Sequence, residues 1–92
     1  MPGAEMKKVL IVDDDVFVRR LFKAVLHRSY DVRDAASGEA AMEIARRWKP
    51  DLVLLDVAMP HADGQETLEL LRSTFEEVPP VIMVSANCSP QQ

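Results

Sequence analysis

Val9-Leu10-Ile11-Val12-Asp13-Asp14-Asp15, residues 9–15, joins a short apolar run to three consecutive acids. Its apolar, β-branched-rich first half predicts a short strand that is buried on both faces. Carboxylates follow at once, and a second apolar run, residues 52–55, likewise ends in an acid, Asp56. Parallel strands of an open α/β sheet place their carboxyl ends along one crevice, where ligands bind. The sequence therefore predicts that Asp56 and the acids of residues 13–15 meet at one edge of a sheet.

The rest of the chain alternates between helical and strand patterns. Asp15 stands at the N-cap position of the first predicted helix, and Ser37 at that of the second, which Pro50 ends. The apolar face of the second helix is predicted to carry Ala40, Ala41, Ile44 and Ala45. Strands are predicted over 9–12, 30–35, 51–56 and 81–84, and helices over 16–26, 38–48 and 65–75. This alternation predicts an α/β domain with a parallel sheet and right-handed crossovers.

Length and composition narrow the class of protein. The 92 residues suit one small domain, residues 1–92, and the formal net charge of -4 argues against direct binding of nucleic acid. With one cysteine, Cys88, the sequence has no internal disulfide. No apolar run approaches the roughly 18 residues that span a membrane, and the N-terminus does not have the pattern of a secretory signal. The expected compartment is the cytoplasm, away from membranes.

The concentration of acids needs a chemical reason. Close carboxylates repel each other by about 1 kcal/mol per pair in water and about 4 kcal/mol near a protein surface. Helix capping accounts for Asp15, but it leaves the adjacent pair Asp13 and Asp14 unexplained. Mg²⁺ prefers a few carboxylate oxygens together with waters and phosphate oxygens. A carboxylate beside such an ion can attack phosphorus, so Asp56 is the candidate nucleophile and Asp13 and Asp14 are candidate metal ligands.

The sequence resembles the receiver domain of two-component response regulators. The resemblance rests on Ile11–Asp15, Asp51–Pro60, Asp63-Gly64 and Pro80–Ala86, whose order and spacing are together specific. It covers Lys7 to about Ala86, nearly the whole chain. It implies a flavodoxin-like, doubly wound parallel sheet and a signalling phosphoacceptor module that depends on Mg²⁺, in place of a turnover enzyme.

Carried over residue by residue, the resemblance implies a role for each matching position. Asp56 accepts a phosphoryl group from a histidine kinase or a phosphotransfer protein. Asp13 and Asp14 hold Mg²⁺ together with Asp56, and Ala58 offers its backbone carbonyl to the metal. Ser85 hydrogen-bonds the phosphoryl oxygen and moves on activation. The loop after the acceptor is shaped by Met59, Pro60, Asp63 and Gly64. Basic residues of the first helix, Arg19, Arg20 and Lys23, are expected on the surface that the kinase reads.

The sequence departs from the family's pattern after Ser85. The family's fifth strand ends in a Lys that pairs with the phosphoryl oxygens, and no basic residue follows Ser85 here. The resemblance therefore predicts a receiver truncated after the fourth strand, with strand order 2-1-3-4 and no fifth strand or helix. Residues 81–84 would then form an edge strand, and an unpaired apolar edge invites another chain. Three explanations stay open: a fragment or engineered truncation, a natural short receiver completed by a partner, and a homo-oligomer that forms through this edge. The homo-oligomer is the hypothesis that the bare edge favours.

Two other functions stay open on the sequence alone. A receiver-like module could bind or dimerise without accepting a phosphoryl group, because the matching Lys is missing. A haloacid-dehalogenase-like phosphatase would use Asp13 as its nucleophile, but Phe17 stands where that family has Thr or Val. His61 lies five residues after Asp56 and is interpreted as a solvated loop residue.

Overall fold

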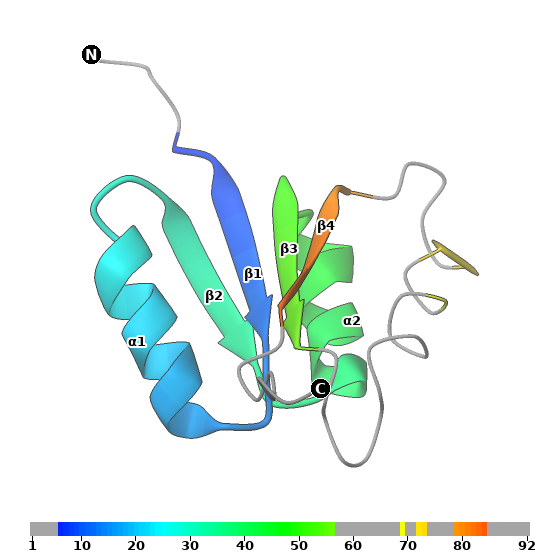
Figure 1. Ribbon diagram of the computed structural model, residues 1–92. Coiled ribbons are helices and arrows are strands. Elements are labelled where there is room, and N and C mark those ends of the chain that lie inside the picture. The colour runs from blue at the N-terminus through cyan, green and yellow to red at the C-terminus, as the bar shows by residue number, and fades with distance from the viewer. Residues whose placement is uncertain (1–5, 57–68, 70–71, 74–78, 85–92) are drawn as a thin grey trace.

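The computed structural model describes residues 6–56, 69, 72–73 and 79–84. Their regular elements are β1 (Lys8–Val12), α1 (Val16–Leu26), β2 (Asp31–Ala35), α2 (Gly38–Trp48), β3 (Leu52–Asp56) and β4 (Val81–Val84). The strands form one parallel sheet of order β2-β1-β3-β4 (Figure 1). The predicted fold class and the strand order 2-1-3-4 are therefore confirmed. Of the helix predicted over 65–75, only Glu69, Arg72 and Ser73 are described, and all are helical.

The path of the chain through the sheet reverses beside β1. The chain steps from β1 to β2, then passes back over β1 to reach β3. With right-handed crossovers, this reversal puts α1 and α2 on opposite faces of the sheet. Figure 1 shows α2 behind β3 and β4, with α1 beside β2. The carboxyl ends of β1 and β3 thus lie at the point of reversal, where ligands bind in folds of this class.

The strand that precedes the acids is buried on both faces. Every residue from Val9 to Val12 exposes 2% or less of its surface. Leu10 and Val12 pair in register with Val53 and Leu55 of β3, so these four side chains share one face. They form the main core with residues from β2 and α2: Ala35, Ala41, Ala45 and Trp48. Because β1 is enclosed in this way, the position of Asp13 directly after it is well fixed.

The buried face of α2 shares Ala41 and Ala45 with the predicted face, and Ile44 is half-buried against the core. The Ser37 hydroxyl accepts a hydrogen bond from the Ala40 backbone N–H at 3.1 Å, which confirms the predicted N-cap. Ala40 itself is exposed, so its prediction as a core residue was wrong. The buried residues of α2 are Gly38, Ala41, Met42, Ala45 and Trp48. Their spacing of three and four residues defines a stripe from which Ala40 is rotated away.

Helix α1 has an N-terminus that matches the prediction but no buried residue. An Asp15 carboxylate oxygen accepts the backbone N–H of Phe17 at 2.9 Å, as an N-cap does. Phe17, Leu21 and Val25 are exposed on this helix. α1 and α2 span 11 residues each. Within the described ranges, no helix has the length and apolar character needed to cross a membrane.

The C-cap of α2 offers a stabilising substitution. Lys49 has φ 57° and ψ 73°, the left-handed region, which a side chain with a Cβ disfavours. Lys49→Gly is therefore expected to raise the free energy of unfolding by about 0.5–1 kcal/mol. The midpoint of urea denaturation measures this change. Lys49→Ala is the matched control, because it removes the charge and keeps the Cβ, and an equal gain in that variant would contradict the explanation.

Candidate metal centre

Three carboxylates meet at the carboxyl ends of β1 and β3. Val12 pairs with Leu55 in the parallel register, so Asp13 and Asp56, the next residues, are neighbours. One carboxylate oxygen each of Asp13, Asp14 and Asp56 lies within 4.8 Å of the other two. Asp13 and Asp56 expose 5% and 6% of their surface, whereas Asp14 is exposed. The structure thus brings together the side chains predicted as metal ligands, with the open side of the cluster at Asp14.

The donor set of this cluster fits a hard divalent cation. Mg²⁺ binds oxygen ligands at about 2.0–2.1 Å, so two oxygens on one ion are about 3–4 Å apart. The separations in the cluster, up to 4.8 Å, are close to this range. Two of the three acids are buried, where charges of one sign are costly without a counter-charge. The residues present therefore fit Mg²⁺, with Asp14 on the exposed side of the cluster.

The backbone of Asp13 is held from two neighbouring elements. Its N–H donates to the carbonyl of Ala35, the last residue of β2, at 3.0 Å. Its carbonyl accepts Nη1 of Arg19, from α1, at 2.7 Å. Its carboxylate accepts the backbone N–H of Asp15 at 2.9 Å. Asp13 is therefore anchored by its main chain while its side chain lies toward the other acids.

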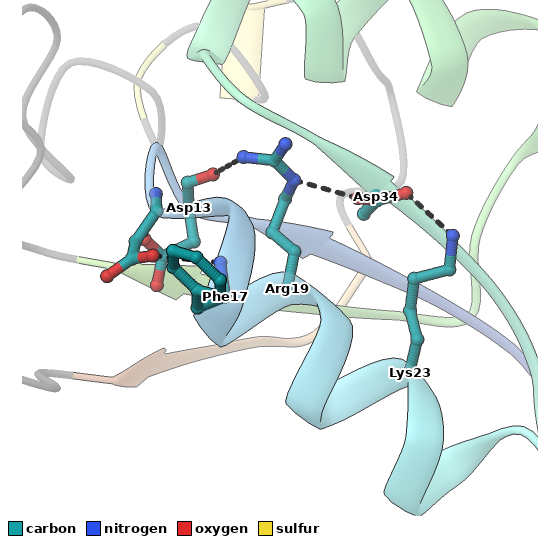
Figure 2. A network of polar contacts seen from close by, with 6 residues as sticks. Asp13, Phe17, Arg19, Lys23 and Asp34 are labelled. Atoms are coloured by element: carbon teal, nitrogen blue, oxygen red, sulfur yellow. Dashed lines mark hydrogen bonds and ion pairs between the residues drawn. The ribbon is translucent and has the colours of Figure 1, made fainter.

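Arg19 connects the backbone of Asp13 to Asp34, near the end of β2. Its Nε donates to one Asp34 oxygen at 2.7 Å, and Lys23 donates to the other at 3.1 Å (Figure 2). Burial alone would raise the pKa of Asp34, but the hydrogen bonds from Arg19 and Lys23 outweigh it and hold the pKa below its ordinary value. Asp34 is therefore a firmly ionised partner of both cations.

The pKa of Asp13 is shifted in the opposite direction to that of Asp34. Burial raises the pKa of its carboxyl above the ordinary value, and the charges of Asp56, Asp14 and Asp15 act in the same direction. The hydrogen bond from the Asp15 backbone opposes this rise but does not cancel it. Without a cation, the ionised form of Asp13 is therefore destabilising in the folded protein.

This difference predicts a pH dependence of stability in the metal-free protein. The pKa of Asp13 is higher in the folded state than its unfolded value of 3.8, so the folded state binds more protons in the window above 3.8. Relative to Asp13→Asn, the wild-type chain should lose stability as the pH rises through that window. Urea denaturation with a chelator, from below pH 3.8 to neutrality, measures this. Asp34→Asn is the control of opposite sign, because Asp34 stabilises above its unfolded pKa and loses that contribution as the pH falls. A pH-independent difference between wild type and Asp13→Asn would refute the prediction.

Several predicted site residues lie outside the described residues. These are Ala58, Met59, Pro60, Asp63, Gly64 and Ser85, and also His61. Their predicted roles stay predictions. Asp15 is a helix cap, as its position indicated.

The contacts of Arg19 with Asp13 and Asp34 were not predicted from the sequence. Arg19 was expected on a surface that a kinase reads, but its side chain is only 14% exposed and contacts Asp13 and Asp34. The available signal was the spacing: Arg19 and Lys23 are four residues apart on α1, and an acid lies near the end of the next strand.

The comparisons with known proteins agree with this geometry. The family model described as response regulator receiver domain matches residues 9–92. The chain is 45% identical over 82 residues to a protein-glutamate methylesterase/protein-glutamine glutaminase of Trichodesmium erythraeum, covering 86% of this chain and 23% of that protein. It is 42% identical over 81 residues to the alkaline phosphatase synthesis transcriptional regulatory protein PhoP of Bacillus subtilis, covering 87% of this chain and 33% of that protein. The chain thus spans a third or less of the length of these two relatives.

Solved structures show the same similarity at the level of the fold. The chemotaxis protein CheY4 of Vibrio cholerae matches with a TM-score of 0.80 and 32% identity, covering 92% of this chain and 72% of that one. The BeF3-activated N-terminal receiver domain of Klebsiella pneumoniae RstA matches with a TM-score of 0.77 and 34% identity, covering 91% and 71%. With a parallel sheet of the same class and an acid cluster at its carboxyl edge, the chain belongs to the response regulator receiver domain family.

Proposed function

We propose that this receiver domain accepts a phosphoryl group on Asp56 in a Mg²⁺-dependent reaction. The observation that carries the proposal is the meeting of Asp13, Asp14 and Asp56, whose carboxylate oxygens lie within 4.8 Å of one another. A buried acid at a strand end beside two further acids is suited to a cation and an incoming phosphoryl group. The phosphodonor in the cell would be a histidine kinase or a phosphotransfer protein, the partners of this family.

In this proposal Asp56 is the nucleophile. One of its carboxylate oxygens forms a bond to phosphorus while the bond from phosphorus to the donor's histidine nitrogen breaks. The nitrogen keeps the electron pair and takes up a proton. Bound Mg²⁺ supplies positive charge that offsets the repulsion between the acids and the phosphoryl oxygens. Hydrolysis of the aspartyl phosphate by water returns the carboxylate and releases inorganic phosphate.

The other residues have supporting roles in the proposal. Asp13 and Asp14 hold the ion, and Asp13 is oriented for this by hydrogen bonds at its backbone N–H, its carbonyl and its carboxylate. The carbonyl of Ala58 is a further proposed ligand, and Ser85 is the proposed donor to a phosphoryl oxygen. Met59, Pro60, Asp63 and Gly64 are proposed to shape the loop after Asp56. A signalling role in the cytoplasm, without turnover of a substrate, is part of the same proposal.

The test is phosphoryl transfer from a small donor, acetyl phosphate, followed by intact mass spectrometry. The proposal expects one phosphoryl group per chain with Mg²⁺ and none with a chelator. Equal labelling with and without Mg²⁺ would contradict the proposed Mg²⁺ dependence. The phosphatase alternative makes a different prediction: turnover of a model phosphate ester, lost in Asp13→Asn and kept in Asp56→Asn.

A receiver-like module that never accepts a phosphoryl group is the second alternative. Beryllofluoride with Mg²⁺ imitates the phosphoryl group, and the RstA receiver domain is described as BeF3-activated. The proposal expects amide NMR signals of β1 and β3 to shift when both reagents are added. Unchanged spectra, together with failed labelling, would favour the silent module.

Self-association through β4 stays a prediction. Ile82 and Met83 of β4 are exposed, and β4 is the outer strand among those described. We expect the 92-residue polypeptide to form dimers or larger species, which light scattering after size-exclusion chromatography measures. Ile82→Lys should shift the equilibrium toward monomer, because a charge on an edge strand disfavours pairing. A folded monomer at micromolar concentration would contradict the prediction.

A further inference from the structure

The Asp13 carbonyl, beside the acid cluster, accepts a hydrogen bond from a charged side chain. At 2.7 Å it accepts Nη1 of Arg19, a charged donor whose hydrogen bonds are shorter and stronger than those of neutral donors. Arg19 comes from the first part of α1, and its side chain is mostly buried between the loop after β1 and the end of β2. Figure 2 shows the guanidinium reaching Asp13 on one side and Asp34 on the other.

The two contacts of Arg19 use different nitrogens of one rigid plane. Nη1 reaches Asp13 while Nε reaches Asp34, each at 2.7 Å. A planar guanidinium that is fixed at two points has little freedom to rotate, whereas a lysine ammonium is a single point charge. Lys23 occupies the second oxygen of Asp34, which limits the rotation of that carboxylate as well. A continuous series of hydrogen bonds thus runs from Lys23 through Asp34 and Arg19 to the carbonyl of Asp13.

These hydrogen bonds restrain the backbone of Asp13, which sets the direction of its side chain. The N–H of Asp13 is fixed to Ala35 and its carbonyl to Arg19, so both peptide groups that flank its Cα are held. The direction of a side chain follows from the backbone that carries it. A shift at this carbonyl would therefore displace the carboxylate relative to Asp56.

We infer that Arg19, braced by Asp34, is a positioning residue that holds the Asp13 main chain so that its carboxylate stays beside Asp14 and Asp56. This inference rests on the proposed function where it concerns Mg²⁺, and on the geometry alone where it concerns Asp13. Partners that orient metal ligands are typically worth about 10–100-fold in metal affinity. Arg19 is proposed to act through Asp13, without touching the metal or the phosphoryl group.

The experiment compares Arg19→Gln and Arg19→Lys with wild type in two measurements on the full chain. Mg²⁺ titration by calorimetry gives the affinity, and amide NMR of the metal-free protein gives hydrogen exchange at Asp13 and Asp15. Arg20→Gln is the matched control, an exposed arginine one residue further along the same helix. Trp48 is buried in the main core, so its fluorescence reports whether each variant is folded.

Arg19→Gln is expected to weaken Mg²⁺ binding about tenfold or more and to speed exchange of the Asp13 and Asp15 amides. Arg19→Lys, which replaces the fork by a point charge, should give an intermediate loss, and Arg20→Gln should match wild type. If folded Arg19→Gln and Arg19→Lys both keep wild-type affinity and exchange, the inference is wrong. If wild type itself binds no Mg²⁺, the proposed function fails separately, and faster exchange in Arg19→Gln would still support the positioning of Asp13.

Discussion

Asp56→Asn is expected to abolish phosphoryl labelling by acetyl phosphate while leaving the fold intact. The amide of Asn is nearly the same size as the carboxylate but lacks its negative charge, so it is a far weaker nucleophile. Asp56 exposes only 6% of its surface, and a substitution of similar volume disturbs the packing around it least. Intact mass spectrometry of the variant, incubated with donor and Mg²⁺, gives the labelled fraction directly.

The matched control for this variant is Asp31→Asn. Asp31 is an exposed acid at the start of β2, paired with Lys8 at the opposite end of the sheet from the acid cluster. Its labelling should equal that of wild type, so a loss in both variants would indicate a general effect of charge. Persistent labelling of Asp56→Asn would show that another residue is the acceptor.

Asp13→Asn is expected to have the second largest effect, with opposite signs on binding and on stability. Unit charges 4 Å apart near a protein surface interact by about 4 kcal/mol, so the loss of one carboxylate should weaken Mg²⁺ binding about 100-fold or more. The free energy of unfolding without metal should rise at neutral pH, because burial and neighbouring acids raise the pKa of Asp13 and disfavour its charge. Calorimetric Mg²⁺ titration and urea denaturation in chelator measure the two quantities.

Asp14→Asn separates this account from a simple effect of net charge. Asp14 is exposed, so water already screens its charge, and the substitution should cost less affinity than Asp13→Asn. Its effect on metal-free stability should be smaller as well. Equal losses of affinity in both variants, or a metal-free Asp13→Asn less stable than wild type, would contradict the picture of a buried acid that a cation stabilises.

The elements of the fold could be predicted because local patterns and packing agree. The run from Val9 to Val12 is apolar without alternation, and in the structure both of its faces are covered. The caps at Asp15 and Ser37 are local hydrogen bonds, which depend on few neighbours. Ala40 was misplaced because an apolar residue beside the edge of a helical stripe can fall on either side of it. The observed stripe also includes Met42 and Trp48, which the sequence pattern did not predict.

The acid cluster could also be predicted, because the register of β1 against β3 places its residues side by side. Once Val12 and Leu55 are neighbours, Asp13 and Asp56 must be as well. The hydrogen bond between Arg19 and Asp34 could not be predicted, because it depends on how α1 is rotated against β2. A charged residue on a helix is usually solvated. The tertiary contact overrides the local expectation at that position.

The position of the phosphoryl group on the chain shows whether Asp56 is the acceptor. Borohydride reduces an aspartyl phosphate to homoserine, which marks the acceptor in peptide mass spectra. After incubation with acetyl phosphate and Mg²⁺, we expect homoserine at position 56 and nowhere else, with none in a sample that contains a chelator. Homoserine at position 13 or 14, or a label that forms equally well without Mg²⁺, would contradict it.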